Sequence, residues 1–450
     1  MDGSELAAAL GSRHIRGLER LTGGASRETW RFDAVAPDGT IDRLVLRRDP
    51  PGRPSERGAM SREAAALRAC SAAGLRVPEV LLDREAPSPW ETAGIVMRRV
   101  EGETLARRIL RDDRYAAARA ALAGDCGRFL AGLHTLPPAA VPGMSSVDPL
   151  ARCRESLALV GPATPTMELA FRWLEAHRPP DRPPVIVHGD FRLGNLVVDE
   201  AGLVAVLDWE LVHAGNPVED LGWLCTKAWR FGTAPPVGGF ASREELLAAY
   251  AAAAGGADVG PGELHWWEVL GTLKWAVGCM GQGAAHLMGA VRSVELAAVG
   301  RRVCEQEWDL LLLLCPEAAA RHRDAAAEPS PPAAGGEGLH GRPTQGELLE
   351  AVVEFLRQEV APGTAGRLSF LSRVAANVVA MVGREVALGP AQAARRAREL
   401  AAVGVASEAE LATAVAAGRF DDAEDRLADV LASGAAAKLA VANPRYLTDP

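Results

Sequence analysis

The sequence predicts an α+β protein in which a small antiparallel sheet with one helix comes first, a larger and mainly helical region follows, and a separate all-helical segment ends the chain. Three observations support this prediction. Short β-like runs fill the first hundred residues, and apolar residues recur at helical spacing from Thr104 onward. Residues 325–342, AAAEPSPPAAGGEGLHGR, are rich in Pro, Gly and Ala without periodicity, which is typical of a linker.

The first region contains short strands and one helix, each bounded by turn signals. Pro37-Asp38-Gly39 marks a hairpin turn between the second and third strands. Good helix formers occupy residues 58–73, and Gly74 is a typical left-handed helix stop. The expected strands are 15–21, 29–35, 43–48, 77–82 and 94–99.

The larger region is predicted from apolar periodicity and helix caps. Residues 115–136 carry apolar side chains at helical spacing, and Ser242 with Glu245 has the spacing of a capping box. Tryptophans enrich this region, and we expect most of them to be core residues, with lining of an apolar substrate pocket as the alternative. They are Trp223, Trp229, Trp266, Trp267 and Trp275.

The segment after the linker is predicted to be an independent helical domain. Thr344 with Glu347 is a capping-box signature before an amphipathic helix, a second helix is expected at 367–388, and a third begins near Ser407. No catalytic cluster is evident there, so docking of a protein partner or formation of a homo-oligomer is the default hypothesis. The expected domains are 1–324, with lobes 1–102 and 103–324, the linker 325–342, and 343–450.

Bulk properties narrow the class of protein. The formal net charge of −9 argues against nonspecific binding of nucleic acid or of an anionic membrane, so the partner is expected to be small. The apolar run Leu310–Cys315 is too short to span a bilayer, the N-terminus lacks a signal pattern, and a cytoplasmic location follows as the default. Seven cysteines occur singly without a Cys-x-x-Cys pair, which favours reduced, mostly buried thiols.

The segment 187–210, VHGDFRLGNLVVDEAGLVAVLDWE, carries the residue types that phosphoryl transfer needs. Asp190 is a carboxylate able to take the proton of an attacking hydroxyl. Asn195 and Asp208 offer hard oxygen ligands suited to Mg²⁺, which bridges the oxygens of a polyphosphate. The flanking apolar runs 185–187 and 196–198 are expected to pair as a short hairpin with the polar residues at its tip. The alternative is a set of ordinary turn residues, and His188 by itself is typical of a hydrogen-bonded structural histidine.

The nucleotide side is predicted from the first region. Between the first two strands, a glycine-containing hairpin is expected to approach the phosphates, although a Gly-Gly pair is also an ordinary turn. It consists of Gly23, Gly24, Ala25 and Ser26, with Ser26 as a hydroxyl donor. Arg47 is the expected phosphate-binding cation and Glu63 its helix partner, with an exposed helix carboxylate as the alternative. Strand alternation would point Arg47 inward with Val45 and Arg48 outward.

The phrases HGDFRLGN, LDWE and GNPVEDLGWL resemble the aminoglycoside phosphotransferase and choline kinase superfamily over about the first 320 residues. The resemblance implies a two-lobed protein-kinase-like fold, with ATP and Mg²⁺ as cofactors. It also implies that Met97 walls the adenine site, that the backbone of Arg98 and Val100 binds the base, and that Asp220 supports the loop with His188 and Arg192. Arg47 departs from the family pattern, which has Lys at this position.

Phrases such as VLRRDPPG and REAAALRA resemble more narrowly the phosphotransferase-like domains associated with acyl-CoA dehydrogenases. The leading hypothesis is therefore a kinase that phosphorylates a hydroxyl of a small metabolite, with a hydroxylated acyl-CoA as the preferred acceptor. The alternative is a noncatalytic kinase-fold module that binds a nucleotide or metabolite and docks a partner through its helical tail. Arg47 in place of Lys favours this alternative, and the Asp190, Asn195 and Asp208 set opposes it.

Overall fold

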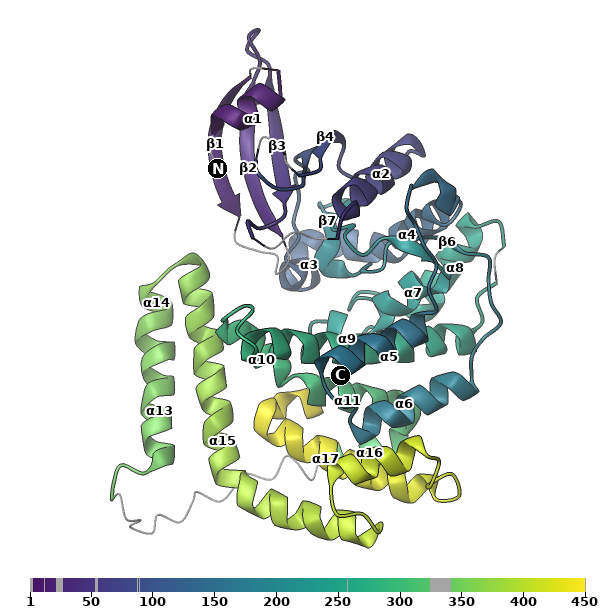
Figure 1. Cartoon of the computed structure of the whole chain (residues 1–450), viewed down its shortest axis with the longest axis vertical. Helices are drawn as coiled ribbons and strands as arrows, with labels where there is room; N and C mark the ends of the chain where they lie inside the picture. Colours follow the sequence, from purple (N-terminus) through teal and green to yellow (C-terminus); the bar gives the residue numbers. More distant parts are fainter. Residues whose placement is uncertain are drawn as a thin grey trace. The chain divides into compact units, whose positions relative to one another are not determined.

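The computed structural model describes residues 3–11, 13–21, 27–52, 56–86, 88, 90–256, 258–323 and 341–449 (Figure 1). The chain forms two compact units. The first comprises Met1–Val147 and Pro180–Trp267, and the second comprises Asp148–Pro179 and Glu268–Pro450. Their boundary runs through the long helix α9 (Pro261–Leu287), so this division differs from the expected one at residues 324–343.

The first unit begins with a five-stranded antiparallel sheet in the order β1-β2-β3-β5-β4. Each strand lies close to its predicted position, because alternating apolar residues and turn signals mark its ends. The strands are β1 (His14–Leu21), β2 (Glu28–Val35), β3 (Ile41–Arg48), β4 (Val80–Arg84) and β5 (Gly94–Arg98).

One face of this sheet packs against α1 (Gly3–Ala9), whose Leu6 joins a core with Leu44 and Leu46 of β3. Arg48 lies on this same face and is only 4% exposed. Its Nε donates to Glu28 at 3.0 Å. The expectation that Arg48 points outward is therefore wrong, because Glu28, Trp30 and the backbone of Trp90 cover its guanidinium on the face that was taken to be exposed.

The predicted helix of the first region is α2 (Ala59–Ala72). It starts after Gly58 and stops before Gly74, which have φ values of 81° and 75° in the left-handed region. Glycine adopts this conformation without the steric cost that a Cβ would bring. Glu63 of α2 is 1% exposed, which excludes the alternative of an exposed helix carboxylate.

The remainder of the first unit is mainly helical. The predicted helices are present as α4 (Ala116–Leu133) and α8 (Arg243–Ala253), which begins with the predicted Ser242 capping box. The two helices approach closely at Gly127, where an added Cβ would lie 2.7 Å from Ala249 Cβ. The other helices of this part are α3 (Ala106–Arg111) and α7 (Val218–Cys225).

Four short strands flank the polar residues of segment 187–210, and the pairing of these strands differs from the prediction. Strand β6 (Val185–Val187) pairs with β9 (His213–Gly215), and β7 (Leu196–Val198) pairs with β8 (Leu203–Val206). The expected hairpin between 185–187 and 196–198 is therefore wrong. Two apolar runs near each other in sequence do not reveal which later strand each one pairs with.

The second unit consists of helices. These are α5 (Pro149–Val160), α6 (Pro165–Ala176), most of α9, α10 (Val294–Gly300), α11 (Val303–Leu314), α12 (Pro316–Arg323), α13 (Gln345–Phe355), a π-helical turn (Leu356–Val360), α14 (Ala361–Gly363), α15 (Gly366–Ala402), α16 (Glu408–Ala416) and α17 (Glu424–Ala442).

The helices after the expected linker share a core with helices before it. Helix α17 packs against α11 and α12, and α16 packs against α6. Trp308 of α11, which is fully buried, lies in one cluster with Leu411 and Leu431. Tyr446 also donates a 2.6 Å hydrogen bond to Asp309. The tail is thus helical as predicted, but in this structure it is not a core of its own. Most of the linker lies outside the described residues.

Helix α15 extends to Ala402, beyond the predicted end at residue 388, and contains Pro390. It is the one described helix that is long and apolar enough, by length and composition alone, to cross a membrane, with a mean hydropathy of 1.2 over 18 residues. This is weak evidence, because core helices of water-soluble proteins pass the same test.

Candidate active site

Residues 188–195, here called the loop 188–195, are held in place by a buried carboxylate. Asp220 of α7 is fully buried and accepts hydrogen bonds from the backbone N–H of His188 at 2.8 Å and of Gly189 at 2.9 Å. Gly189 has φ +81°, and an added Cβ would lie 2.5 Å from the carbonyl oxygen of Leu211. A glycine is therefore required at this turn. Asp220 lies where the resemblance implied, beneath the loop.

His188 has both ring nitrogens engaged in the protein. Its Nδ1 accepts from the backbone N–H of Asp190 at 3.1 Å, and its Nε2 lies 3.0 Å from the carbonyl oxygen of Leu207. The ring is fully buried. An imidazole that accepts at Nδ1 and donates at Nε2 is neutral. His188 therefore fits a structural role in the loop better than that of a proton shuttle.

The carboxylate of Asp190 is held by three side-chain donors. Asn195 Nδ2 donates to Oδ2 at 2.7 Å, and Trp223 Nε1 donates to Oδ1 at 2.8 Å. Arg192 Nε lies 3.0 and 3.1 Å from the two oxygens. Hydrogen bonds to an ionised carboxylate are short and strong, so these contacts fix its orientation.

Asn195 and Asp208 each keep an oxygen that fits a metal ion. Asn195 uses its Nδ2 for Asp190, and no residue in the described part of the chain donates to its Oδ1. Asp208 Oδ1 accepts from Arg47, and within the described ranges nothing donates to Oδ2. The backbone N–H of Leu207, next to Asp208, donates to the carbonyl of Asn195 at 2.8 Å and ties the two segments together.

Backbone strain marks the same position. Asp208 has φ +66°, one of three non-glycine residues with positive φ among those the structure describes. A side chain in this region costs energy that the surrounding structure must offset, and such residues cluster at functional sites. No group of three or more His, Cys, Asp or Glu side chains in the described ranges is arranged to hold a metal. A metal here would depend on Asn195, Asp208 and oxygens of a bound ligand.

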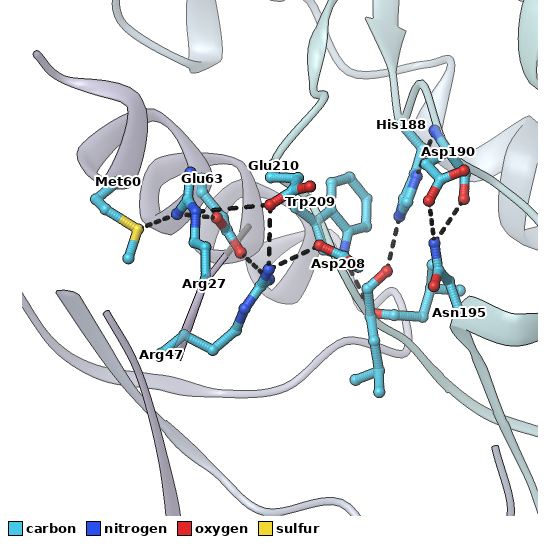
Figure 2. A network of polar contacts seen from close by, with 12 residues as sticks. Arg27, Arg47, Met60, Glu63, His188, Asp190, Asn195, Asp208, Trp209 and Glu210 are labelled. Carbon is cyan, nitrogen blue, oxygen red and sulfur yellow. Dashed lines mark hydrogen bonds and ion pairs between the residues drawn. The ribbon is translucent and has the colours of Figure 1, made fainter. Parts of the chain in front are cut away.

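Arg47 connects the sheet to Asp208. Its Nη2 lies 2.7 Å from Asp208 Oδ1 and 3.6 Å from Glu210 Oε2, and Nη1 contacts Glu63 (Figure 2). The structure thus brings Arg47 and Glu63 together as the sequence predicted. Burial by itself raises the pKa of Asp208, but the positive charge of Arg47 outweighs this effect and the pKa is lowered.

Arg27 is a second buried arginine in this cluster, and the sequence analysis missed it. Its Nη1 donates to Glu63 at 2.9 Å, and its Nε lies 3.6 Å from Glu210. It also contacts the sulfur of Met60 (Figure 2). We call Arg27, Arg47, Glu63, Asp208 and Glu210 the arginine network. No local signal marked Arg27, because its role depends on partners far away in the sequence.

Trp223 was named in the sequence only as a core residue or as lining of a substrate pocket, and its role as a donor to Asp190 was missed although a signal was available. It lies three residues after Asp220 on α7, so the two side chains share a helix face. One holds the backbone of the loop 188–195 and the other holds its Asp190 carboxylate. Applying helical spacing to the phrase GNPVEDLGWL would have identified Trp223.

The remaining predicted nucleotide residues are tested only in part by the structure. Met97 lies on β5 and is 6% exposed. The N–H of Arg98 already donates to the carbonyl of Glu79 at 2.9 Å, so only the carbonyl of Arg98 is left to bind a base. Val100 follows the end of the strand. Gly23, Gly24, Ala25 and Ser26 lie outside the described residues.

The arrangement combines groups suited to phosphoryl transfer in one unit. An oriented carboxylate, Asp190, lies beside an amide oxygen, and Asp208 lies between that pair and the guanidinium of Arg47 (Figure 2). Such a set positions a hydroxyl, offers oxygen ligands to a divalent metal and supplies a cation for phosphate.

Comparisons with known proteins agree with this geometry. Residues 17–267 match the model of the "Phosphotransferase enzyme family", and residues 362–446 match a "Domain of unknown function (DUF6285)". Acyl-CoA dehydrogenase family member 11 of Rattus norvegicus is 27% identical over 356 residues, which cover 71% of this chain and 42% of that protein. Acyl-CoA dehydrogenase family member 10 of Mus musculus is 38% identical over 82 residues, or 18% and 8% of the two chains. The chain thus spans less than half the length of these curated relatives.

A crystal structure of a candidate aminoglycoside phosphotransferase from Ralstonia eutropha is similar in fold. It has a TM-score of 0.54 and 22% identity, and the match covers 69% of this chain and 98% of that one. The kinase-like architecture, an N-terminal antiparallel sheet followed by mainly helical structure, is therefore confirmed. Because the family model covers more than half of the 450 residues, this protein belongs to the phosphotransferase enzyme family.

Proposed function

We propose that the protein transfers a phosphoryl group from ATP to a hydroxyl of a small metabolite, with Mg²⁺ as cofactor. The observation that carries this proposal is the Asp190 carboxylate, held by Asn195 at 2.7 Å in the same unit as Asp208 and Arg47. A protein that only binds a nucleotide has no need for an oriented base beside two metal ligands. Membership of the phosphotransferase family supports the same class of reaction.

In this proposal, Asp190 accepts a hydrogen bond from the acceptor hydroxyl, aims it at the terminal phosphoryl group and takes its proton. Asn195 and Trp223 keep the carboxylate oriented, because each donates to a different oxygen. Arg47 binds the phosphates near the attacked group, and Glu63 holds the guanidinium from the other side. Asp220 keeps the loop backbone in place throughout.

Asn195 and Asp208 would hold Mg²⁺ through the two oxygens that the described residues leave without a donor. When bound, the metal ion would offset the negative charge that develops on the transferred phosphoryl group. Arg47 must then share Asp208, since its Nη2 lies 2.7 Å from Oδ1 of that carboxylate. Nucleotide phosphates would give this guanidinium a second anionic partner.

We propose a hydroxylated acyl-CoA or a similar metabolite as the acceptor. The support comes from the relatives, whose names place them among acyl-CoA dehydrogenase family members. Trp223 and Trp229, with ring centroids 5.2 Å apart beside Asp190, supply an aromatic surface close to the reacting position. Aromatic side chains commonly line sites for partly apolar ligands.

The test is turnover of ATP and GTP against hydroxylated acyl-CoAs, sugars, amino alcohols and aminoglycosides, with the Asp190→Asn variant in parallel. Asparagine keeps the shape of the side chain but cannot take a proton, so transfer should fall about 10²- to 10⁴-fold. Mg²⁺-dependent nucleotide binding, measured by calorimetry, should remain. Full turnover by Asp190→Asn would refute the assignment of the base.

One observation favours the noncatalytic alternative. The ion pair between Arg47 and Asp208 neutralises a proposed metal ligand, and Arg stands where related kinases have Lys. The alternative predicts that the protein binds a nucleotide but transfers no phosphoryl group from ATP to any acceptor. It also predicts that replacement of Arg47 by Lys gives no phosphoryl transfer. The kinase proposal predicts that Arg47→Lys keeps activity, because the smaller ammonium still binds phosphate as a point charge.

We further propose self-association through α13 and α15. Exposed large apolar side chains gather on these helices, and a two-helix hairpin covers only part of its own apolar surface. They are Leu348, Val352, Phe355, Leu368, Phe370, Val382 and Val386. Light scattering of the full chain and of Phe355→Glu tests this: the wild type should be a dimer or larger, and the variant smaller. A wild-type monomer at micromolar concentration refutes it.

A further inference from the structure

Arg192 uses only one of its three guanidinium nitrogens to hold Asp190. Nε lies 3.0 and 3.1 Å from the two carboxylate oxygens. Among the residues that the structure describes, none accepts a hydrogen bond from the two terminal nitrogens. A guanidinium has five N–H donors, so four remain available beside the proposed base. The side chain is 25% exposed, which leaves these donors within reach of a ligand.

The guanidinium is fixed in orientation by aromatic rings. Its Cζ lies 4.7 Å from the ring centroid of Trp229, and this ring is 5.2 Å from that of Trp223. An arginine stacked on an aromatic face loses little further freedom when it binds a planar anion. Gly194 makes room for it, because an added Cβ would lie 2.4 Å from Arg192 Nη1. The glycine at position 194 thus leaves room for the guanidinium of Arg192 in this position.

The guanidinium of Arg192 stacks on Trp229, next to Trp223, although its Nε lies almost equally far from the two oxygens of Asp190. The proposed metal ligands lie on the side of Asn195. Asn195, the neighbour of Asp208, donates to Oδ2 of Asp190, whereas Trp223 donates to Oδ1. Under the proposed function, the nucleotide phosphates occupy the side of Asn195 and Asp208. The acceptor must then approach Asp190 from the side where Arg192 stacks.

We propose that Arg192 binds a carboxylate or phosphate group of the phosphoryl acceptor and selects anionic acceptors. This inference rests on the proposed phosphoryl transfer to a small metabolite and specifies the substrate class of the same site. It favours a free hydroxy acid or its phosphate over the thioester of a hydroxylated acyl-CoA, which has no anionic group close to the acyl hydroxyl. A hydroxyl bonded to Asp190 and an anion bonded to the terminal nitrogens of Arg192 would be roughly 4–7 Å apart by ordinary hydrogen-bond lengths. The anionic group therefore lies two to four bonds from the carbon that bears the hydroxyl. Polycationic acceptors meet like charge at Arg192 and are disfavoured.

The test measures binding of a matched pair of ligands to the full chain saturated with Mg²⁺ and ADP. The probes are 4-hydroxybutanoate and its uncharged amide, titrated by calorimetry or saturation-transfer NMR. The wild type should bind the acid at least tenfold more tightly than the amide. Arg192→Gln should weaken binding of the acid about 10- to 100-fold more than binding of the amide, since only the anion loses charge-assisted hydrogen bonds.

Two variants act as controls. Arg128→Gln removes the same charge from an arginine that is 64% exposed and pairs with Asp125 elsewhere in the unit, and it should change neither ligand. Arg192→Lys keeps the charge and should restore part of the preference for the acid. Thermal unfolding of each variant shows whether it is folded.

Four outcomes would overturn the proposal. They are equal binding of acid and amide by the wild type, binding of neither ligand, equal weakening of both by Arg192→Gln, and weaker binding of a nonhydrolysable ATP analogue but not of ADP by that variant. The last outcome would assign Arg192 to the terminal phosphate of the nucleotide. An intact preference for the acid with no transfer to any acceptor refutes the proposed function instead, whereas transfer without that preference refutes only the anion site.

Discussion

The loop 188–195 and the arginine network meet at Asp208 but are built in different ways. The loop is held by N–H groups of the backbone, of Asn195 and Trp223 and of one guanidinium, Arg192. They donate to two carboxylates, Asp190 and Asp220, and all these partners lie within about 35 residues of one another in sequence. The network is held by two buried guanidiniums, and its contacts span long distances in sequence, such as the one that joins Arg47 to Asp208, 161 positions away.

This difference suggests that the loop 188–195 is already in its binding conformation before ligands bind, whereas the arginine network must change its contacts when they bind. Hydrogen bonds from Asn195, Trp223 and the partly exposed Arg192 fix the carboxylate of Asp190, and none of these donors belongs to the arginine network. In the network, by contrast, Arg47 and Asp208 form an ion pair with each other, and both side chains are also proposed to contact ligands. We therefore expect substitutions in the network to affect stability most, and substitutions in the loop to affect phosphoryl transfer most.

The largest effect on stability is expected for Glu63→Gln. This change leaves Arg27 and Arg47 buried with one shared negative charge fewer, and breaking a buried ion pair costs about 3–5 kcal/mol. Chemical denaturation measures the free energy of unfolding. Glu79→Gln is the control, because Glu79 pairs with Arg98 at the surface, where such pairs contribute about 0–1 kcal/mol. Equal effects of the two variants would show that the network does not stabilise the fold.

Asp220→Asn is expected to reduce both the free energy of unfolding and the rate of phosphoryl transfer. The asparagine can accept from only one of the two loop amides, and its NH₂ group faces the other, which costs about 1–3 kcal/mol. The loop then shifts and kcat falls, because Asp190 is no longer aimed. Unchanged kcat in a folded Asp220→Asn variant would contradict the view that Asp220 acts by positioning.

A smaller effect is expected for Trp223→Phe. Phenylalanine keeps the aromatic ring but removes one of the donors to Asp190. We expect kcat to fall about tenfold, which corresponds to roughly 1.4 kcal/mol for one charge-assisted hydrogen bond. The KM for ATP should not change, since the nucleotide side is untouched. A raised KM for ATP with normal kcat would show that Trp223 acts on nucleotide binding and not on the orientation of Asp190.

The smallest effect is a pH dependence of stability. The folded pKa of Asp208 is lowered because Arg47 outweighs the effect of burial, so its ionised form contributes stability above the unfolded value near 3.8. This contribution is lost as the pH falls through the lowered folded pKa. The stability difference between wild type and Asp208→Asn should thus be constant near pH 7, start to fall near the unfolded value of 3.8, and disappear only as the pH passes through the lowered folded pKa. A difference that grows on acidification has the wrong sign for this ion pair.

The sequence by itself determined the order of elements and the chemistry of the loop 188–195. Turn residues, strand alternation and helix caps are local signals, and they located the five strands of the sheet and the Ser242 and Thr344 capping boxes. The motif with Asp190, Asn195 and Asp208 was also visible, because its members lie within 19 residues of one another.

Only the tertiary structure decided which segments pair across long distances. It joined β6 to β9 and β7 to β8, buried Arg48 against Glu28 and the carbonyl of Trp90, brought Arg27 to Glu63, and merged the helical tail with the core around Trp308. These outcomes depend on competition among many apolar faces and charges for partners. A local pattern shows that a strand, a helix face or an arginine needs a partner, but the free energy of the whole fold selects which one it obtains.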